Sequence, residues 1–198
     1  YRQLVSLQAS EKKFAEAATT MREFREKFPA QFGFSEYELL ISLLLDAGKP
    51  EEAYNEAYEY TRQVGKELAS FQGTREEVAT FNQEKVREIA RLVNILHYRG
   101  SPALAWRLLE PYDSQVGQFP ELAAEKSYIL INTGRAQEAY ELMDMLYKQG
   151  KLPDSLKRDY MFLALQHGET DTALAVLDQI DVAALNEGQA VSMLEMAA

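Results

Sequence analysis

The chain has 198 residues, 46% of them hydrophobic, and its 21 Lys plus Arg against 31 Asp plus Glu give a formal net charge of −10. This length and composition suit a folded protein with a sizeable buried core and argue against disorder. The charge disfavours nucleic acids and anionic membrane surfaces, which proteins bind through clustered cations, whereas a cationic peptide or polymer is compatible with it.

The sequence lacks the residues of several familiar kinds of site. It has no cysteine, which excludes disulfides and thiolate metal sites. No apolar run approaches the roughly 20 residues that cross a bilayer, and residues 1–4 show no signal-peptide pattern. His97 and His167 are too far apart for a local metal motif, and no phosphate loop, nucleophile elbow, dinucleotide fingerprint or zinc-protease motif is present. We therefore expect no catalytic residue, no metal and no cofactor, and the chain is predicted not to be an enzyme.

The first elements in chain order are predicted to be helices. Residues 1–9 have the pattern of the tail of one helix, and a second follows with Phe14, Ala17, Met21 and Phe24 on one face. Lys12 lies in the turn between them. A capping-box sequence that begins at Ser35 predicts the start of the next helix. The apolar residues of that helix are Tyr37, Leu40, Ile41 and Leu44.

The middle of the chain predicts two unusually long helices. One is expected from Glu51 to about Ser70, followed by a break at Gln72-Gly73. A second capping box begins at Thr74 and predicts the next helix. We expect both helices to project beyond their neighbours at one edge. This feature is interpreted either as a tolerated insertion or as a docking element.

Glycine and alanine recur at one interval in the second half of the chain. Glycines at positions 100, 134 and 168 are 34 residues apart, and so are alanines at positions 105, 139 and 173. A glycine at the end of a helix favours a positive φ, and an alanine inside the next helix allows two helices to cross closely. Gly48 and Ala53 repeat the same order earlier in the chain.

On this spacing the sequence resembles the tetratricopeptide repeat (TPR) family, whose unit is a 34-residue helix–turn–helix. The resemblance implies an all-α fold, a right-handed α-solenoid of TPR helix–turn–helix pairs. It implies a single array over residues 1–198 and a chain cut from a longer protein. The expected repeats are about 1–32, 33–72 with an extended second helix, 74–117 with an extended first helix, 119–151 and 153–184, with a partial helix at 187–198.

The resemblance also implies a binding groove lined by the first helix of each pair. Mixed aromatic and amide side chains there suit an extended peptide or a glycan. The expected groove residues are Arg87, Asn94, His97, Tyr98, Glu121, Tyr128, Asn132, Arg158, Phe162 and Gln166. Co-chaperone repeats grip a C-terminal carboxylate through cations in this groove. The corresponding positions here include Ala90, Ala124 and Glu125, so that subtype is not expected.

Three functions follow as hypotheses. The first is a protein-interaction scaffold, a segment of a larger bacterial envelope protein with a basic partner or a polysaccharide-modifying enzyme as its ligand. The second is direct binding of a cationic polysaccharide. The chain resembles the periplasmic TPR arrays of outer-membrane exopolysaccharide exporters for Pel, cellulose and poly-N-acetylglucosamine, which favours the periplasmic side of a Gram-negative outer membrane. The third is a cytosolic regulator that binds a peptide.

Overall fold

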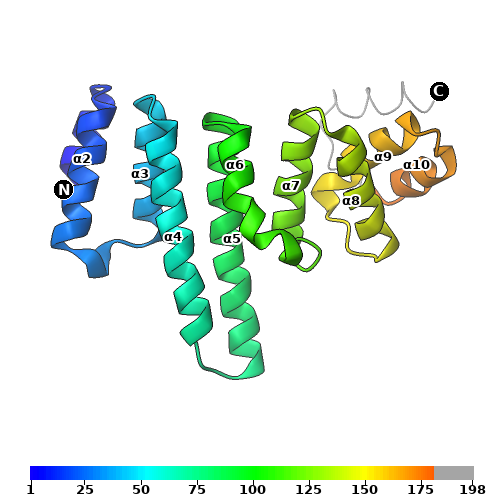
Figure 1. The fold of residues 1–198 in the computed structure, drawn as a ribbon, viewed down its shortest axis with the longest axis horizontal. Coiled ribbons are helices and arrows are strands. Elements are labelled where there is room, and N and C mark those ends of the chain that lie inside the picture. The colour runs from blue at the N-terminus through cyan, green and yellow to red at the C-terminus, as the bar shows by residue number, and fades with distance from the viewer. Residues whose placement is uncertain (181–198) are drawn as a thin grey trace. The chain divides into compact units, whose positions relative to one another are not determined.

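The computed structural model describes residues 1–180, and within this range all regular structure is helical, with no strand (Figure 1). The prediction of an all-α fold is confirmed. Contacts divide the chain into two compact units, Tyr1–Thr133 and a second that begins at Gly134. The partial helix expected at 187–198 and the last residues of the expected repeat 153–184 lie outside the described residues.

The first unit is built from consecutive helices that pack as pairs. Its elements are α1 (Arg2–Ser10), α2 (Phe14–Lys27), η1 (Pro29–Gln31), α3 (Phe34–Asp46), α4 (Pro50–Ser70), α5 (Arg75–Arg99), α6 (Pro102–Leu109), η2 (Glu110–Gln115) and α7 (Pro120–Asn132). The pairs are α1 with α2, α3 with α4, and α5 with α6. Helices α3, α5 and α7 also pack side by side, in that order, as do α4 and α6.

The second helix of each pair carries a small side chain in the core. Ala17 in α2, Ala53 in α4 and Ala105 in α6 are completely buried. Leucine and isoleucine side chains around them, including Leu40 and Ile89, fill the space between pairs. A larger residue at an alanine position would push the two helices apart, because protein interiors are close-packed.

The turns after the first helix of each pair are made in two ways. Gly48 has φ +73°, the left-handed conformation that glycine adopts without steric cost. Gly100 has φ −114°, so the expectation of a positive φ is wrong there. A Cβ at position 100 would lie 2.9 Å from the Leu96 carbonyl oxygen and 3.1 Å from Leu45 Cδ2. Glycine is therefore required at position 100 for space.

The two expected capping boxes have different outcomes. At the start of α5 the Glu77 amide donates to Thr74 Oγ1 at 3.3 Å, and the Thr74 amide donates to Glu77 Oε2 at 2.8 Å, as predicted. The prediction for Ser35 is wrong, because the N-cap of α3 lies two residues earlier and the helix already begins at Phe34. Gly33 is the N-cap, and its amide donates to Glu36 Oε2 at 3.0 Å.

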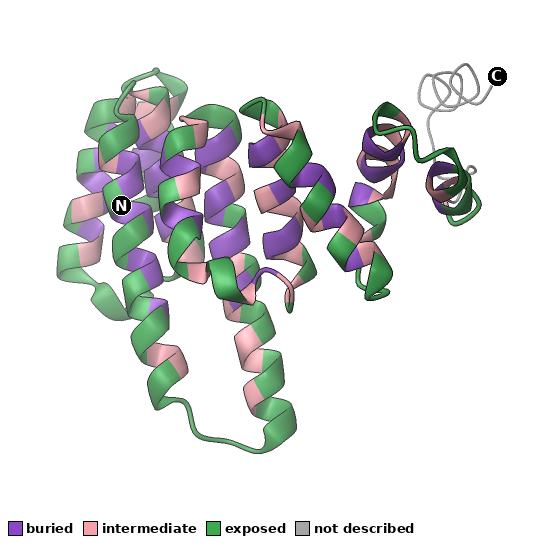
Figure 2. Cartoon of the chain, turned by 45° about the vertical axis from the view of Figure 1, so that its right-hand side comes forward, coloured by how far each residue is buried: buried purple, intermediate pink, exposed green. Residues whose placement is uncertain are grey.

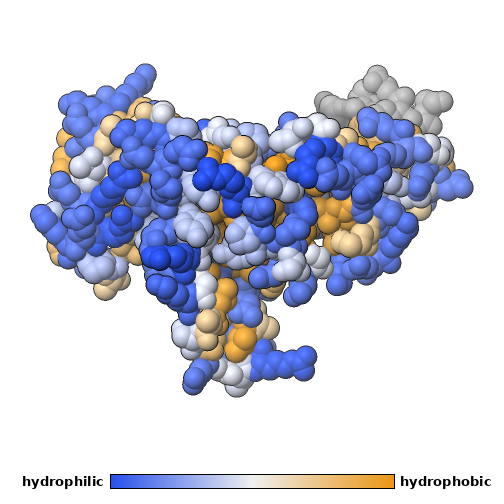
Figure 3. Space-filling model, viewed as in Figure 1, coloured by the Kyte–Doolittle hydropathy of each residue, from blue (hydrophilic) through white to orange (hydrophobic). Residues whose placement is uncertain are grey.

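The distal halves of α4 and α5 extend as a hairpin beyond the neighbouring helices (Figure 1). These helices have 21 and 25 residues, which agrees with the two over-long helices expected from the sequence. The Tyr60 hydroxyl donates to Glu88, and Lys85 pairs with both Glu67 and Glu88 at the base of the hairpin. Most residues of the distal halves are exposed or half-buried (Figure 2), and hydrophobic side chains gather on them (Figure 3).

The second unit contains α8 (Ala136–Lys148), α9 (Asp154–Gln166) and α10 (Thr170–Leu177). Helix α9 packs against both α8 and α10. Its Tyr160 is completely buried, and the Tyr160 hydroxyl donates to Asp144 Oδ1 of α8 at 2.9 Å. Ala139 is completely buried in this unit.

Lys12 gives a stability prediction, because it has φ +60° in the turn between α1 and α2, whereas glycine, Gly48 with φ +73°, is found in the turn between α3 and α4. A left-handed conformation costs an L-residue about 1–2 kcal/mol, and glycine avoids this cost. Glycine also has a larger entropy in the unfolded state, which cancels part of the gain in stability. We expect Lys12→Gly to increase the free energy of unfolding by about 0.5–1 kcal/mol in urea titrations. Lys12→Ala, which removes the side chain but keeps Cβ, is the control and should have little effect. An equal gain in both variants would contradict a backbone origin.

Candidate functional site on helices α5 and α7

Two matching stripes of side chains form what we call the polar face. On α5 the stripe consists of Arg87, Arg91, Asn94 and Tyr98, and on α7 it consists of Glu121, Glu125, Tyr128 and Asn132. In both helices the steps are four, three and four residues, which places the members on one side of the helix. The helices pack against each other, so the two stripes are neighbours.

Polar contacts join α5 and α7 at three levels. Arg87 Nε, in the middle of α5, donates to Glu121 Oε1, at the start of α7, at 2.8 Å. One level further, Asn94 Nδ2 lies 3.0 and 3.2 Å from the two carboxylate oxygens of Glu125. At the far end Asn132 Nδ2 lies 2.9 Å from His97 Nε2. The structure therefore brings together Arg87 with Glu121 and His97 with Asn132, all four of which were expected in the groove.

His97 differs from the exposed groove residue that the sequence suggested, since only 6% of its surface is accessible. Burial lowers its pKa, which favours the neutral imidazole. Its Nδ1 is buried without a hydrogen-bond partner. His97 is therefore buried behind the polar face, where it contacts Asn132. Its ring packs against Tyr98 with 4.5 Å between ring centroids.

Tyr98 is the most accessible aromatic side chain of the polar face, with 59% of its surface exposed. Tyr128 is half-buried and Asn132 is exposed. The face thus presents an exposed ring beside hydrogen-bonding groups whose positions are fixed by cross-helix contacts. Such a surface can bind a peptide with little loss of side-chain entropy.

The remaining expected groove residues lie on α9 of the second unit. Arg158 and Phe162 are half-buried, and Gln166 is exposed. Arg158 lies 3.6 Å from Asp159, whose pKa is raised by burial. These three residues are therefore a candidate surface of the second unit.

Sequence reasoning left two members of the polar face out of the expected groove. Arg91 donates through Nε to Glu38 Oε1 at 2.6 Å and so links α5 to α3. Glu125 was treated only as a position without positive charge. The 34-residue spacing could have identified both, because Arg91 and Glu125 are 34 residues apart and lie one turn after Arg87 and Glu121.

Glu125 has the most perturbed carboxyl group of the polar face. Burial raises its pKa to about 7, and the hydrogen bond from Asn94 acts in the opposite direction. A carboxyl group in this range is partly protonated at neutral pH. It can therefore change its charge in response to a ligand.

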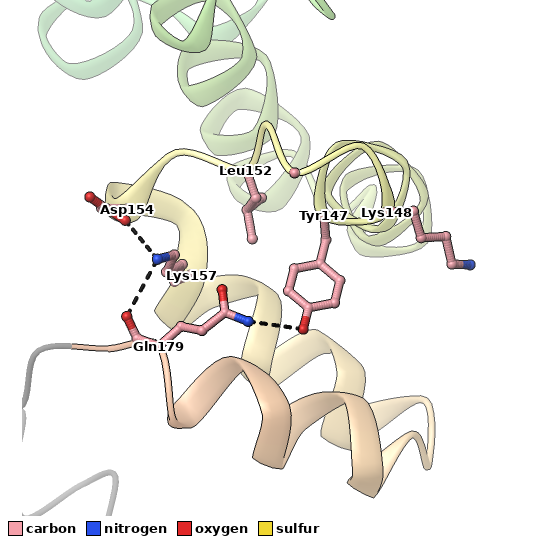
Figure 4. A pocket seen from close by; sticks show the side chains of 7 residues that line it. Tyr147, Lys148, Leu152, Asp154, Lys157 and Gln179 are labelled. Carbon is pink, nitrogen blue, oxygen red and sulfur yellow. Dashed lines mark hydrogen bonds and ion pairs between the residues drawn. The ribbon is translucent and has the colours of Figure 1, made fainter.

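The second unit contains a cavity of about 610 Å³ between the end of α8, the loop before α9, and Gln179 (Figure 4). Gln179 Nε2 donates to the Tyr147 hydroxyl at 3.2 Å. Lys157 Nζ contacts both Asp154 Oδ1 at 2.8 Å and the Gln179 carbonyl at 3.4 Å. The cavity is large enough for a small polar ligand and combines an aromatic ring with amide and charged groups.

Among residues 1–180 no group of three or more His, Asp or Glu side chains is arranged to hold a metal ion. None of the described helices is long and apolar enough to cross a membrane. A comparison of the sequence with protein-family models gave no match, and comparisons with curated proteins and with solved structures gave none either.

Glu125 gives a prediction for stability against pH. Its pKa is about 7 in the folded chain against an ordinary value of 4.5, so the folded state holds the proton more tightly. The stability that this proton provides is complete below pH 4.5 and is lost as the pH rises through 7. Glu125→Gln cannot ionise, so we expect its free energy of unfolding to gain about 1–3 kcal/mol relative to wild type between pH 5 and 8.

Urea unfolding at pH 5, 6, 7 and 8 measures this difference. Glu23→Gln, which removes an exposed carboxylate from α2, is the control for net charge. A constant difference between Glu125→Gln and wild type across this range would show that the carboxyl group is ionised throughout.

Proposed function

We propose that the chain is a non-catalytic protein-interaction scaffold whose polar face on α5 and α7 contacts a partner protein. The observation that carries this proposal is the pair of matched stripes, fixed by cross-helix hydrogen bonds and bearing the exposed ring of Tyr98. Tyrosine is among the residues that contribute most to binding energy at protein interfaces.

A right-handed α-solenoid of the TPR kind is part of the proposal. Support comes from the 34-residue spacing of glycine and alanine and from the pairing of consecutive helices. Ion pairs with the same 34-residue separation join Arg2 to Glu36 and Arg87 to Glu121. Stacked repeats form extended surfaces that are used for binding.

The charge of the chain favours a basic partner, because a net charge of −10 attracts cationic surfaces and accelerates association. The resemblance to exopolysaccharide exporters suggests an envelope protein on the periplasmic side, with a polysaccharide-modifying enzyme as the partner. The alternative is that the chain is a cytosolic regulator that binds a peptide on the same surface.

A second candidate function, binding of a polysaccharide, is favoured by the cavity of the second unit. Its ring, amide and charged groups around Tyr147, Lys157 and Gln179 suit the hydroxyl groups and apolar faces of a sugar. This cavity is remote in sequence from the polar face, so the two functions can be tested with different substitutions.

The scaffold is tested by capture from a bacterial envelope extract, with mass spectrometry of retained proteins and a parallel glycan assay. We expect Tyr98→Ala to reduce retention of a specific protein about tenfold or more, as at an interface hot spot, with an unchanged melting temperature. Tyr58→Ala is the matched control, since Tyr58 is 48% exposed on α4. Equal retention by both variants would contradict the assignment of the polar face, and retained glycan without protein would favour the second candidate.

A further inference from the structure

Glu125 is set apart from the other carboxylates by its lack of a cation. Within residues 1–180 every other Asp or Glu that is buried or half-buried has a Lys or Arg nitrogen within 4.0 Å. Glu125 instead accepts hydrogen bonds from the neutral amide of Asn94. A half-buried carboxylate without a cation is costly in its charged form.

The charged groups on the surrounding elements do not neutralise Glu125. On α5, Arg87 and Arg91 are paired with other carboxylates, as are Lys126 of α7 itself and Arg107 of α6. Asp113 of η2 is the partner of Lys126 and supplies no positive charge. His97 is buried, and burial favours its neutral form. None of these surrounding Lys and Arg side chains therefore serves as the counter-ion of Glu125.

We propose that Glu125 is the docking point for a lysine side chain of a partner protein, with Asn94 holding the carboxylate in place. This inference deepens the proposed scaffold function and rests on it. The ammonium group would replace the missing ion pair, and its aliphatic stem would lie along the stripe beside Tyr128, one turn further along α7.

The geometry favours lysine over other cations. Asn94 Nδ2 contacts both oxygens of the carboxylate, at 3.0 and 3.2 Å, and so occupies the edge that a bidentate guanidinium would need. Ammonium is a compact charge that needs only one oxygen. Glu125 is also half-buried, so the cation must be carried at the end of a long, unbranched side chain. The amino group of an amino sugar is attached directly to a bulky ring and lacks this reach.

Binding of an ammonium group has a thermodynamic signature at this site. With a pKa of about 7, the free carboxyl group is about half protonated at pH 7, and a neighbouring cation favours the ionised form. Binding must therefore release protons, and affinity must rise with pH up to the pKa of the free state. Binding to carboxylates that are already ionised would release none.

The test is isothermal titration calorimetry of the whole chain with penta-lysine, in two buffers of different ionisation enthalpy. At pH 7 we expect release of about 0.5 proton per site, and affinity that rises up to about 30-fold between pH 5.5 and 8. Glu125→Gln should lose the proton release and weaken binding about tenfold. Its folding is checked by the urea titrations described above.

Three controls make the result specific. Glu23→Gln changes the net charge by the same amount and should bind like wild type, whereas equal weakening in both variants would overturn the site in favour of general attraction. Penta-lysine acetylated at Nε should not bind. Equal binding and proton release with penta-arginine or a glucosamine trimer would overturn the assignment to lysine.

The calorimetry is independent of the capture experiment with Tyr98→Ala. Failure of proton release with penta-lysine would remove the lysine site and leave partner capture intact. If the wild-type chain captured no specific protein, that result would instead contradict the scaffold function itself.

Discussion

Close contact between paired helices at a completely buried alanine is the constraint on which the rest of the structure depends. Ala53 and Ala105 allow α4 and α6 to approach their partners closely. Helices that occupy the same place in successive pairs lie close enough for their polar side chains to pair. Arg2 with Glu36, Arg22 with Glu56 and Arg87 with Glu121 are all separated by 34 residues.

The polar face is a consequence of this packing. A hydrogen bond between α5 and α7 requires a donor and an acceptor at matching heights, and the packing of the two helices side by side provides that match for pairs that are 34, 31 and 35 residues apart. Each contact fixes a side chain that would otherwise be free, so a ligand meets an ordered surface. The contacts that join α5 to α7 therefore also order the polar face that we propose as the binding surface.

Much of the helical structure could be predicted from the sequence, because it depends on local patterns. The Thr74 capping box and the lengths of α4 and α5 follow from residue types within a few positions of each other. Gly100 could not be interpreted in this way. Its turn has negative φ, and glycine is needed because a Cβ would lie 2.9 Å from the Leu96 carbonyl oxygen and 3.1 Å from Leu45, a residue more than fifty positions away. Lys12 is the converse case, a non-glycine residue in a conformation that glycine would favour.

The candidate site could be predicted only in part, for a related physical reason. The family resemblance placed Asn94, Tyr98 and Glu121 in the expected groove, and helical spacing identifies which residues share a stripe. It does not show which charges are already neutralised, because ion pairs join helices distant in sequence. Glu38, for example, is neutralised by Arg91 from α5.

Glu125 becomes distinctive only when all of these pairs are known. A half-buried carboxylate without a cation lowers stability at neutral pH, and replacement by glutamine would remove that cost while keeping the hydrogen bond from Asn94. Such a cost is understandable if a partner supplies the missing charge, since the binding free energy then includes relief of the unpaired carboxylate. In the proposed complex, Glu125 would therefore be the contact of the polar face that depends most on the charge of the partner.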